Sequence, residues 1–401
     1  MSISSKATGL RPGVCTSTTR PTSPYLGQLI FQTDTGTMHN WDGATWQFLA
    51  PTQQRNILYN GAMQVAQRGT STPSITANGY YTADRWQVGL ITLGTWTQSV
   101  ENDAPTGSGF RKSLKMLCTT ADASPVSTDV CAVQQVLEGQ DLQAFRKGTS
   151  SAQQFTVSFW VKANVTGTYI LFLQDYDNNR SVSKTYTVSS SATWEFKTLT
   201  FPADTTGALD NDNALSFGVR WVLAAGPSWT SGTRNETWDS ITLANLAQGQ
   251  TVNLASATNN YWQITGVQLN VGGVAAPFEF KSYGQELAEC QRYYQRHDLG
   301  GSYFMIAAPV GSGNGLIQYS LPVPMRAAPT FTASSGSCLR PLTTGGSSVG
   351  TTNTTSVGWY STANQYGGQI YFSGSSGLTA GAAVGVYINS GAYFEFTGAE
   401  L

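Results

Sequence analysis

The sequence predicts an all-β protein, and three observations point to this fold class. Several segments alternate apolar and polar residues with the period of two that is typical of half-buried strands. The 42 glycines fit short strands joined by many turns. Only residues 283–297 have the spacing of an amphipathic helix. We therefore expect a short N-terminal β meander, a large jelly-roll-like β-sandwich, one linking helix and a smaller C-terminal β-sandwich.

Length and composition limit the number of domains and the classes of function. A chain of 401 residues exceeds one ordinary hydrophobic core and predicts two or three domains. Charged residues make up 11% of the chain, against about 25% in a typical globular protein. The net charge of −1 leaves no basic field for phosphates, so we expect no nucleic-acid partner.

Targeting and cysteine patterns set further expectations. No apolar run approaches the roughly 18 residues of a spanning helix, so we expect no membrane insertion. Residues 1–14 lack the apolar centre of a signal peptide, so we expect the chain to fold in a cytoplasm. Five widely spaced cysteines without a C-x-x-C pair argue against a disulfide framework or a zinc site.

Residues 1–54 form the first predicted unit, a segment for attachment or trimerisation. Residues 27–33, 36–41 and 46–49 have the composition of three short strands, and Asp42-Gly43 is a strong hairpin signal. A meander of this size is marginally stable alone, so it needs a docking partner or another copy of itself. Its candidate contact residues are the large apolar ones, Ile30, Phe31, Trp41 and Trp46.

Residues 55–282 predict a jelly-roll-like sandwich of roughly eight to ten strands. In residues 155–163, Phe, Val, Phe and Val alternate with Thr, Ser, Trp and Lys, as in a strand with one buried face. Residues 216–223 show the same alternation. In residues 262–269 the alternation changes phase, and a bulge near Gly266 would bring the apolar side chains onto one face.

The predicted helix, residues 283–297, links this sandwich to a second one at residues 298–401. Leu287, Cys290 and Tyr294 follow the spacing i, i+3, i+7 and form one apolar stripe. The stripe must be buried, and the flanking β domains are the obvious surfaces for it. Glycine-, serine- and threonine-rich linkers separate the short strands expected in residues 298–401.

Catalytic and metal-binding patterns are almost lacking in this sequence. The two histidines, His39 and His297, have no Ser or Cys partner at motif spacing, so we expect neither a catalytic triad nor a cofactor. Asp175, Asp177 and Asn179 have calcium-loop spacing, but an arginine follows where the loop needs glycine, which indicates a turn. A pair of carboxylates for glycoside hydrolysis stays open, because their separation is invisible in a sequence.

Aromatic residues are the one functional resource present in quantity, with 11 Trp, 18 Tyr and 17 Phe. A flat aromatic face can stack on the C–H side of a sugar ring. Aromatics within turn-rich, polar stretches are therefore the candidates for glycan binding. They are Trp229, Trp238, Trp359, Tyr360 and Tyr366.

Several segments together resemble tail-fibre and receptor-binding proteins of tailed bacteriophages. The most specific is W-x-I-T-G-V-Q-L-x-V-G followed by Y-G-x-E-L-A-x-C-Q-R-Y-Y, within residues 262–294. Residues 155–163 are also similar to strands of carbohydrate-binding-module jelly rolls. The remaining matching segments are P-x-x-G-Q-x-I-F-x-T-D-T-G with W-D-G-x-x-W (24–46), N-x-L-x-N-G-A-x-Q-V-x-Q-R-G-T (56–70), A-D-R-W (83–86), P-V-P-M-R-A-A-P-T (322–330) and F-x-F-x-G-A-E-L (394–401).

This resemblance implies a homotrimer located in the virion tail. Its N-terminal segment would be anchored to other tail proteins, and its β domains would bind host-surface polysaccharide or lipopolysaccharide. Leu287, Cys290 and Tyr294 would then face either the C-terminal domain or the threefold axis. Two alternatives stay open: a structural virion protein without a glycan site (head fibre, decoration protein or tail connector), and a polysaccharide depolymerase.

Overall fold

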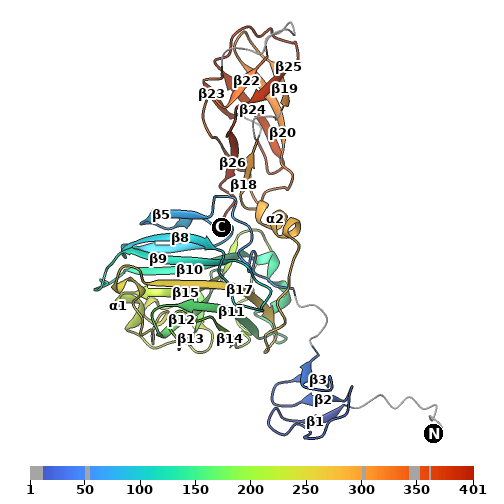
Figure 1. Ribbon diagram of the computed structural model, residues 1–401, viewed down its shortest axis with the longest axis vertical. Coiled ribbons are helices and arrows are strands. Elements are labelled where there is room, and N and C mark those ends of the chain that lie inside the picture. Colours follow the sequence, from blue (N-terminus) through green and yellow to red (C-terminus); the bar gives the residue numbers. More distant parts are fainter. Residues whose placement is uncertain (1–11, 50–54, 300–303, 343–352, 361–362) are drawn as a thin grey trace, which may run out of the picture.

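The computed structural model describes residues 12–49, 55–299, 304–342, 353–360 and 363–401. Within these ranges the protein is nearly all β-structure, which confirms the predicted fold class. It has three parts (Figure 1). A small N-terminal module and a C-terminal domain lie at opposite ends of an elongated molecule, and a large β-sandwich lies between them.

The N-terminal module, residues 12–49, is a four-stranded sheet. The predicted meander forms from β2 (Leu29–Gln32), β3 (Thr37–Trp41) and β4 (Trp46–Phe48). A further strand, β1 (Gly13–Cys15), pairs in parallel with β2, although its composition predicts poor packing. The predicted boundary at residue 54 lies outside the described residues.

The sandwich consists of two antiparallel sheets of seven and six strands, more than the roughly eight to ten predicted. Two of the edge strands are only two residues long. The seven-stranded sheet contains, in spatial order, β16 (Asp239–Ser240), β13 (Arg180–Val188), β12 (Gly167–Asp175), β15 (Leu215–Ala225), β10 (Val130–Glu138), β7 (Gln87–Ile91) and β6 (Gly79–Tyr80). The six-stranded sheet contains β14 (Glu195–Phe201), β11 (Phe155–Ala163), β17 (Tyr261–Val271), β9 (Ser113–Thr120), β8 (Thr95–Glu101) and β5 (Ser71–Ile75).

Short helical turns connect these strands without adding a layer. They are η1 (Gly139–Asp141), η2 (Gln143–Phe145), α1 (Pro227–Thr230), η3 (Leu243–Asn245) and η4 (Leu254–Ser256). Of these, α1 contributes Trp229 to a small apolar cluster on the outer face of the seven-stranded sheet, together with Ile170, Phe172 and Val222. The middle of this face is therefore partly covered.

Alternate residues of each strand form the core between the two sheets. On β15 the predicted set, Phe217, Val219, Trp221 and Leu223, is fully buried in this core. Because side chains alternate along a strand, the residues between them lie on the outer face of the sheet. Arg220 is the charged residue among them.

Strand β17 contains the predicted bulge. Its pairing with β11 shifts register between Ser158 and Trp160, and Gly266 on the opposite strand has a φ of 60°. The extra residue places Trp262 and Ile264 on the same side as Val267 and Leu269, and all four are fully buried. Only glycine fits there, because a Cβ at residue 266 would lie 2.6 Å from the ring of Phe110.

The linking helix α2 (Tyr283–Gln291) begins where predicted but ends six residues early. At its start the Ser282 hydroxyl accepts a hydrogen bond from the backbone N–H of Gln285 at 3.3 Å. Residues predicted as its last turn instead form β18 (Gln295–Asp298), which pairs with β26. The helical spacing there is local, and pairing with a strand about 100 residues away overrides it.

The C-terminal domain packs two sheets around one core and forms the smaller of the two predicted sandwiches. The three-stranded sheet contains, in spatial order, β18, β26 (Tyr393–Thr397) and β21 (Thr330–Ala333). The six-stranded sheet contains β22 (Leu339–Pro341), β25 (Val384–Ile388), β19 (Phe304–Pro309), β20 (Gly315–Ser320), β24 (Gly367–Ser373) and β23 (Ser356–Trp359).

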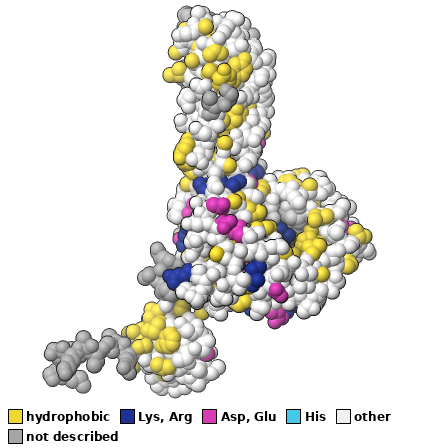
Figure 2. All heavy atoms as spheres, turned by 180° about the vertical axis from the view of Figure 1, so that it is seen from behind, with side chains coloured by type: hydrophobic (Ala, Val, Ile, Leu, Met, Phe, Trp, Pro, Cys, Tyr) yellow, Lys and Arg dark blue, Asp and Glu magenta, His cyan; other side chains and the backbone are white. Residues whose placement is uncertain are grey.

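Arg85 lies at the seam, which we define as the contact between the sandwich, α2 and residues 399–401. Its side chain is fully buried, and its guanidinium binds the Glu400 carboxylate and the carbonyl oxygen of Val136. Its Cζ lies 3.5 Å from the ring centroid of Tyr293, just beyond α2. Figure 2 shows charged side chains gathered around this level of the molecule, whereas the C-terminal domain carries few.

A second arginine repeats this arrangement. Arg68 lies 3.2 Å from the Glu400 carboxylate, and its Cζ is 3.5 Å from the ring centroid of Tyr294. The Tyr294 hydroxyl donates a hydrogen bond to Glu395 on β26. The seam therefore joins the two domains through charged and aromatic groups rather than through a shared apolar core.

We predict that the Glu400→Gln substitution destabilises the full chain by about 3–5 kcal/mol. The substitution leaves the guanidinium of Arg85 buried without a carboxylate, and an unpaired buried charge has about this cost. Urea unfolding measures the loss. The matched control is Glu236→Gln, because Glu236 is 72% exposed in its pair with Arg234 and should change stability by less than about 1 kcal/mol. Equal effects of the two substitutions would contradict the prediction.

A second prediction concerns pH. Burial raises the pKa of Asp84 to about 6, although the positive charge of Arg68 opposes the rise. The folded state therefore keeps this proton to a higher pH than the unfolded state. The contribution of Asp84 to the free energy of unfolding is largest below about pH 4 and is lost between about pH 4 and 6. The loss amounts to about 3 kcal/mol. The free energy of unfolding is measured for the wild type and for Asp84→Asn across about pH 4–7. We expect the difference between the two proteins to change up to about pH 6 and to be constant above it. A pH-independent difference would contradict the assignment.

Candidate functional site

The two sandwich tryptophans that the sequence predicts as glycan-binding residues lie in different environments. Trp238 belongs to the core, where its ring packs near Phe155 and Phe217 and its indole N–H donates to the Pro202 carbonyl oxygen at 2.9 Å. No broad face of Trp238 is left for a sugar. Trp229 is also largely buried, but it lines an open groove on the outer face of the seven-stranded sheet.

The three predicted aromatics of the C-terminal domain do not form one surface. Trp359 packs against Phe331 and Phe396, and its indole N–H donates to the Pro329 carbonyl oxygen at 3.2 Å. Tyr360 is 47% exposed and Tyr366 is 59% exposed. The two tyrosines therefore stay candidates for sugar contacts on the C-terminal domain, whereas Trp359 packs against the core of that domain.

The predicted apolar stripe of the helix is mostly covered within one chain. Cys290 and Tyr294 are fully buried, and Leu287 is half-buried. Tyr294 faces the C-terminal domain, the first of its two predicted locations, through its hydrogen bond to Glu395. Cys290 and Tyr294 are thus unavailable as contacts between copies of this chain, because the seam already covers them.

The groove occupies about 360 Å³ on the outer face of the seven-stranded sheet. Its polar floor is a single row of paired residues on three adjacent strands: Gln87 on β7, Gln134 on β10 and Arg220 on β15. The Gln134 amide donates to the Gln87 side-chain oxygen, and the Arg220 Nε donates to the Gln134 side-chain oxygen. Hydrogen bonds within the row therefore fix the orientation of each polar group.

Small residues hollow the sheet beside this row. Gly89 pairs with Ala132 in the next register position of the same face, where neither carries a large side chain. On the other side, a Cβ at Gly218 would lie 3.1 Å from the Tyr176 ring, so the missing side chain lets this ring approach the strand. Tyr176 and Trp229 both line the groove. The result is a row of hydrogen-bonding groups between aromatic side chains.

Sequence reasoning did not identify Gln87, Gln134, Arg220 or Tyr176. A signal was present for one of them, because Arg220 is a charged residue within an otherwise apolar strand. The others belong to the groove only because β7, β10 and β15 are neighbours in the sheet. These residues are spread from position 87 to position 220 of the sequence, and no local pattern relates them.

The turn with calcium-loop spacing is closed by a lysine. The Lys147 ammonium contacts the carboxylates of Asp175 and Asp204 and donates to the Gly207 carbonyl oxygen at 2.9 Å. It thus fills the space between these oxygens. In the described part of the chain, no group of three or more His, Cys, Asp or Glu side chains could hold a metal ion, and no helix is long and apolar enough to cross a membrane.

Of the predicted contact residues of the N-terminal module, Ile30 is buried, and Phe31, Trp41 and Trp46 are half-buried. Trp41 and Trp46 pack edge to face with their ring centroids 5.5 Å apart. The most exposed apolar side chains of the module are others, and an apolar patch is visible on it in Figure 2. They are Val14, Tyr25, Leu26, Leu29 and Leu49.

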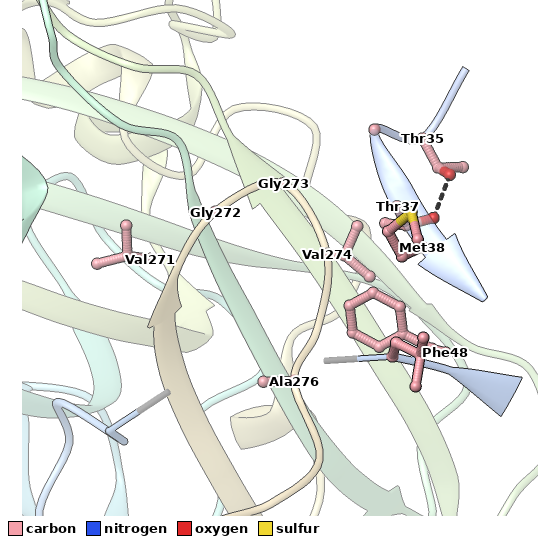
Figure 3. A pocket seen from close by; sticks show the side chains of 11 residues that line it. Thr35, Thr37, Met38, Phe48, Val271, Gly272, Gly273, Val274 and Ala276 are labelled. Atoms are coloured by element: carbon pink, nitrogen blue, oxygen red, sulfur yellow. Dashed lines mark hydrogen bonds between the residues drawn. The ribbon is translucent and has the colours of Figure 1, made fainter. Parts of the chain in front are cut away.

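A second pocket, of about 360 Å³, lies between the N-terminal module and the loop after β17 (Figure 3). Met38 and Phe48 line it from the module, and Val274 and Ala276 line it from the loop. The described residues around this pocket include no charged side chain. Such a lining suits apolar packing better than a hydroxyl-rich ligand.

No protein-family model matches the chain, and no curated protein matches its sequence. Among solved structures, the chain is similar to the enzymatically active domain of bacteriophage CBA120 tailspike protein 4, at 14% identity and a TM-score of 0.29, over 54% of this chain and 21% of that chain. It is also similar to TmCBM61 in complex with β-1,4-galactotriose, at 11% identity and a TM-score of 0.27, over 54% of this chain and 99% of that chain. A third similar structure is the family 11 carbohydrate-binding module from Clostridium thermocellum in complex with a β-1,3-1,4-mixed-linked tetrasaccharide, at 8% identity and a TM-score of 0.26, over 52% and 98% of the two chains. These are weak likenesses of fold, and they leave the question of function to the residues of the groove.

Proposed function

We propose that this chain is a bacteriophage tail-fibre or receptor-binding protein that holds host-surface polysaccharide or lipopolysaccharide in the groove of its seven-stranded sheet. The observation that carries the proposal is the row formed by Gln87, Gln134 and Arg220 between Tyr176 and Trp229. The resemblance of several sequence segments to phage tail proteins supports the viral part of the proposal.

The chemistry of the groove suits a sugar. Sugar hydroxyls donate and accept hydrogen bonds, and amide side chains offer both functions from fixed positions. The aromatic side chains of Tyr176 and Trp229 supply apolar contact for the C–H faces of the rings. Because hydrogen bonds within the row hold Gln134 and Arg220 before any ligand arrives, little side-chain entropy is lost on binding.

The proposed role is binding without cleavage. Glycoside hydrolysis by the common mechanisms uses two carboxyl groups beside the bond that breaks. The described residues that line the groove include no Asp or Glu side chain. A glycan in this groove therefore meets groups that hold it, and a depolymerase would need a different site.

The N-terminal module serves as the attachment end in this proposal. It lies at the end of the molecule opposite the C-terminal domain (Figure 1). Its exposed apolar side chains, among them Tyr25 and Leu26 at 70% and 75% exposure, suit burial against other chains of a homotrimer and against tail proteins of the virion. A purely structural virion protein would share this module but would have no use for the groove.

We predict that Gly89→Leu weakens glycan binding by at least about tenfold, because the new side chain fills the groove beside the polar row. The substitution should leave the fold intact, since the nearest atoms to a Cβ at residue 89 lie 3.9 Å away. Binding of the full chain to an array of bacterial polysaccharides, followed by calorimetry with a bound polysaccharide, measures the effect.

The matched control is Gly358→Leu on β23 of the C-terminal domain. A Cβ at residue 358 has open space around it, and Tyr360 lies two positions further along. If Gly358→Leu abolishes binding and Gly89→Leu does not, the exposed tyrosines of the C-terminal domain form the site instead. Absence of binding to every polysaccharide by the wild type would favour the structural virion protein.

We also predict that the double substitution Tyr25→Ser, Leu26→Ser weakens assembly while each chain keeps its glycan affinity. Each replaced side chain removes burial worth about 1.5–3 kcal/mol from a contact between chains. Light scattering measures the oligomeric state over a range of concentrations. Val126→Ser is the control, because Val126 is equally apolar and 65% exposed but belongs to the sandwich. An unchanged trimer in the double variant would exclude this surface from the assembly contact.

A further inference from the structure

We infer that the groove selects an acidic saccharide and that the carboxylate of this sugar binds Arg220. The inference rests on the proposed function, because it names the class of glycan that the same groove would take. It does not follow from the sheet architecture or from the aromatic side chains. It follows from the surroundings of one arginine.

Arg220 has no acidic partner among the described residues. Its Nε donates to the Gln134 side-chain oxygen, and its Nη2 lies 3.5 Å from the Tyr176 hydroxyl. Its Cζ lies 5.2 Å from the ring centroid of Phe172. All of these neighbours are uncharged side chains, so no described carboxylate side chain pairs with the half-buried Arg220.

Three other cations of the described chain with little side-chain exposure are each paired with a carboxylate. Arg85 binds Glu400, Lys147 binds Asp175 and Asp204, and Lys281, with a side-chain exposure of 4%, binds Glu289 at 2.7 Å. Burying a cation without a partner has a cost of several kcal/mol. Burial also lowers the pKa of Arg220, which is the expected sign for a cation that water does not reach freely. An anion entering the groove would offset this cost.

The geometry leaves one end of the guanidinium available. Nη1 makes no hydrogen bond to any described residue, and it is not among the buried polar atoms that lack a partner. It is therefore open to solvent in the groove. Because the other two nitrogens are held by Gln134 and Tyr176, the free end keeps a fixed direction, which suits a planar carboxylate.

The remaining lining distinguishes a carboxylate sugar from a phosphate. Arg220 is the one basic side chain among the described residues of the groove, and a phosphate dianion usually attracts several donors of positive charge. The other polar groups include the amides of Asn78, Gln87 and Gln134, which match neutral hydroxyls. The lining therefore fits a uronic acid residue within a glycan of otherwise neutral sugars.

The experiment measures binding of the full chain to an array that pairs each acidic bacterial polysaccharide with its carboxyl-reduced form. The array also carries neutral polysaccharides and phosphate-bearing teichoic acids. We expect carboxyl reduction to weaken binding by about 10- to 100-fold, the range for losing a hydrogen bond between charged groups. Binding of the acidic form should also weaken as salt concentration rises.

Three variants locate the effect on Arg220. Arg220→Met should lose the preference for the acidic form, and Arg220→Lys should keep part of it, because lysine retains the charge without the planar fork. Arg234→Met is the control elsewhere in the sandwich, since Arg234 already pairs with Glu236. If Arg220→Met does not fold, the comparison of acidic and reduced polysaccharides on the wild type still decides.

Each outcome bears on the inference. Equal binding of acidic and reduced forms, or binding of neutral polysaccharides that Arg220→Met retains, would overturn it and leave the proposed glycan binding intact. Binding confined to teichoic acids would replace the carboxylate by a phosphate and overturn the assignment. Absence of binding to any array member would overturn the inference together with the proposed function.

Discussion

The buried ion pair between Arg85 and Glu400 is the interaction on which the arrangement of this chain depends. It joins a residue at the start of the sandwich to a residue that follows the last strand of the C-terminal domain. Water does not reach the arginine side chain, so separating the two domains would leave an unpaired charge in an apolar site. The ring of Tyr293 adds a contact from the segment after α2. Three parts of the chain are therefore held by one guanidinium.

Four of the segments that resemble phage tail proteins meet at this seam. Arg68 comes from the segment at residues 56–70, Arg85 from A-D-R-W, Tyr293 from the helical segment, and Glu400 from the final F-x-F-x-G-A-E-L. These segments lie far apart in the sequence, and their charged and aromatic residues are partners in space. Residues of these four segments thus hold the domains together, whereas the three strands that carry the polar row of the groove lie outside them.

The seam and the groove differ in how their arginines are partnered. At the seam, Arg85 pairs with Glu400, and Arg292 pairs with Glu138 at 2.7 Å. In the groove, Arg220 is held by an amide and a phenol instead. Paired charges at the seam stabilise the folded chain, whereas an unpaired charge in an open groove is available to a ligand. The same residue type therefore supports the architecture in one place and, in our proposal, recognition in the other.

The sequence by itself determined the all-β class, the N-terminal meander, the core face of β15 and the bulge at Gly266, because each depends on alternation or turn chemistry within about ten residues. It also named Trp229, which lines the groove. The tertiary structure alone decided that the helix ends at Gln291, that Trp238 and Trp359 support cores, and that Gln87, Gln134 and Arg220 form one row. These outcomes depend on which strands become neighbours, and pairing between distant strands leaves no periodic signal in the local sequence.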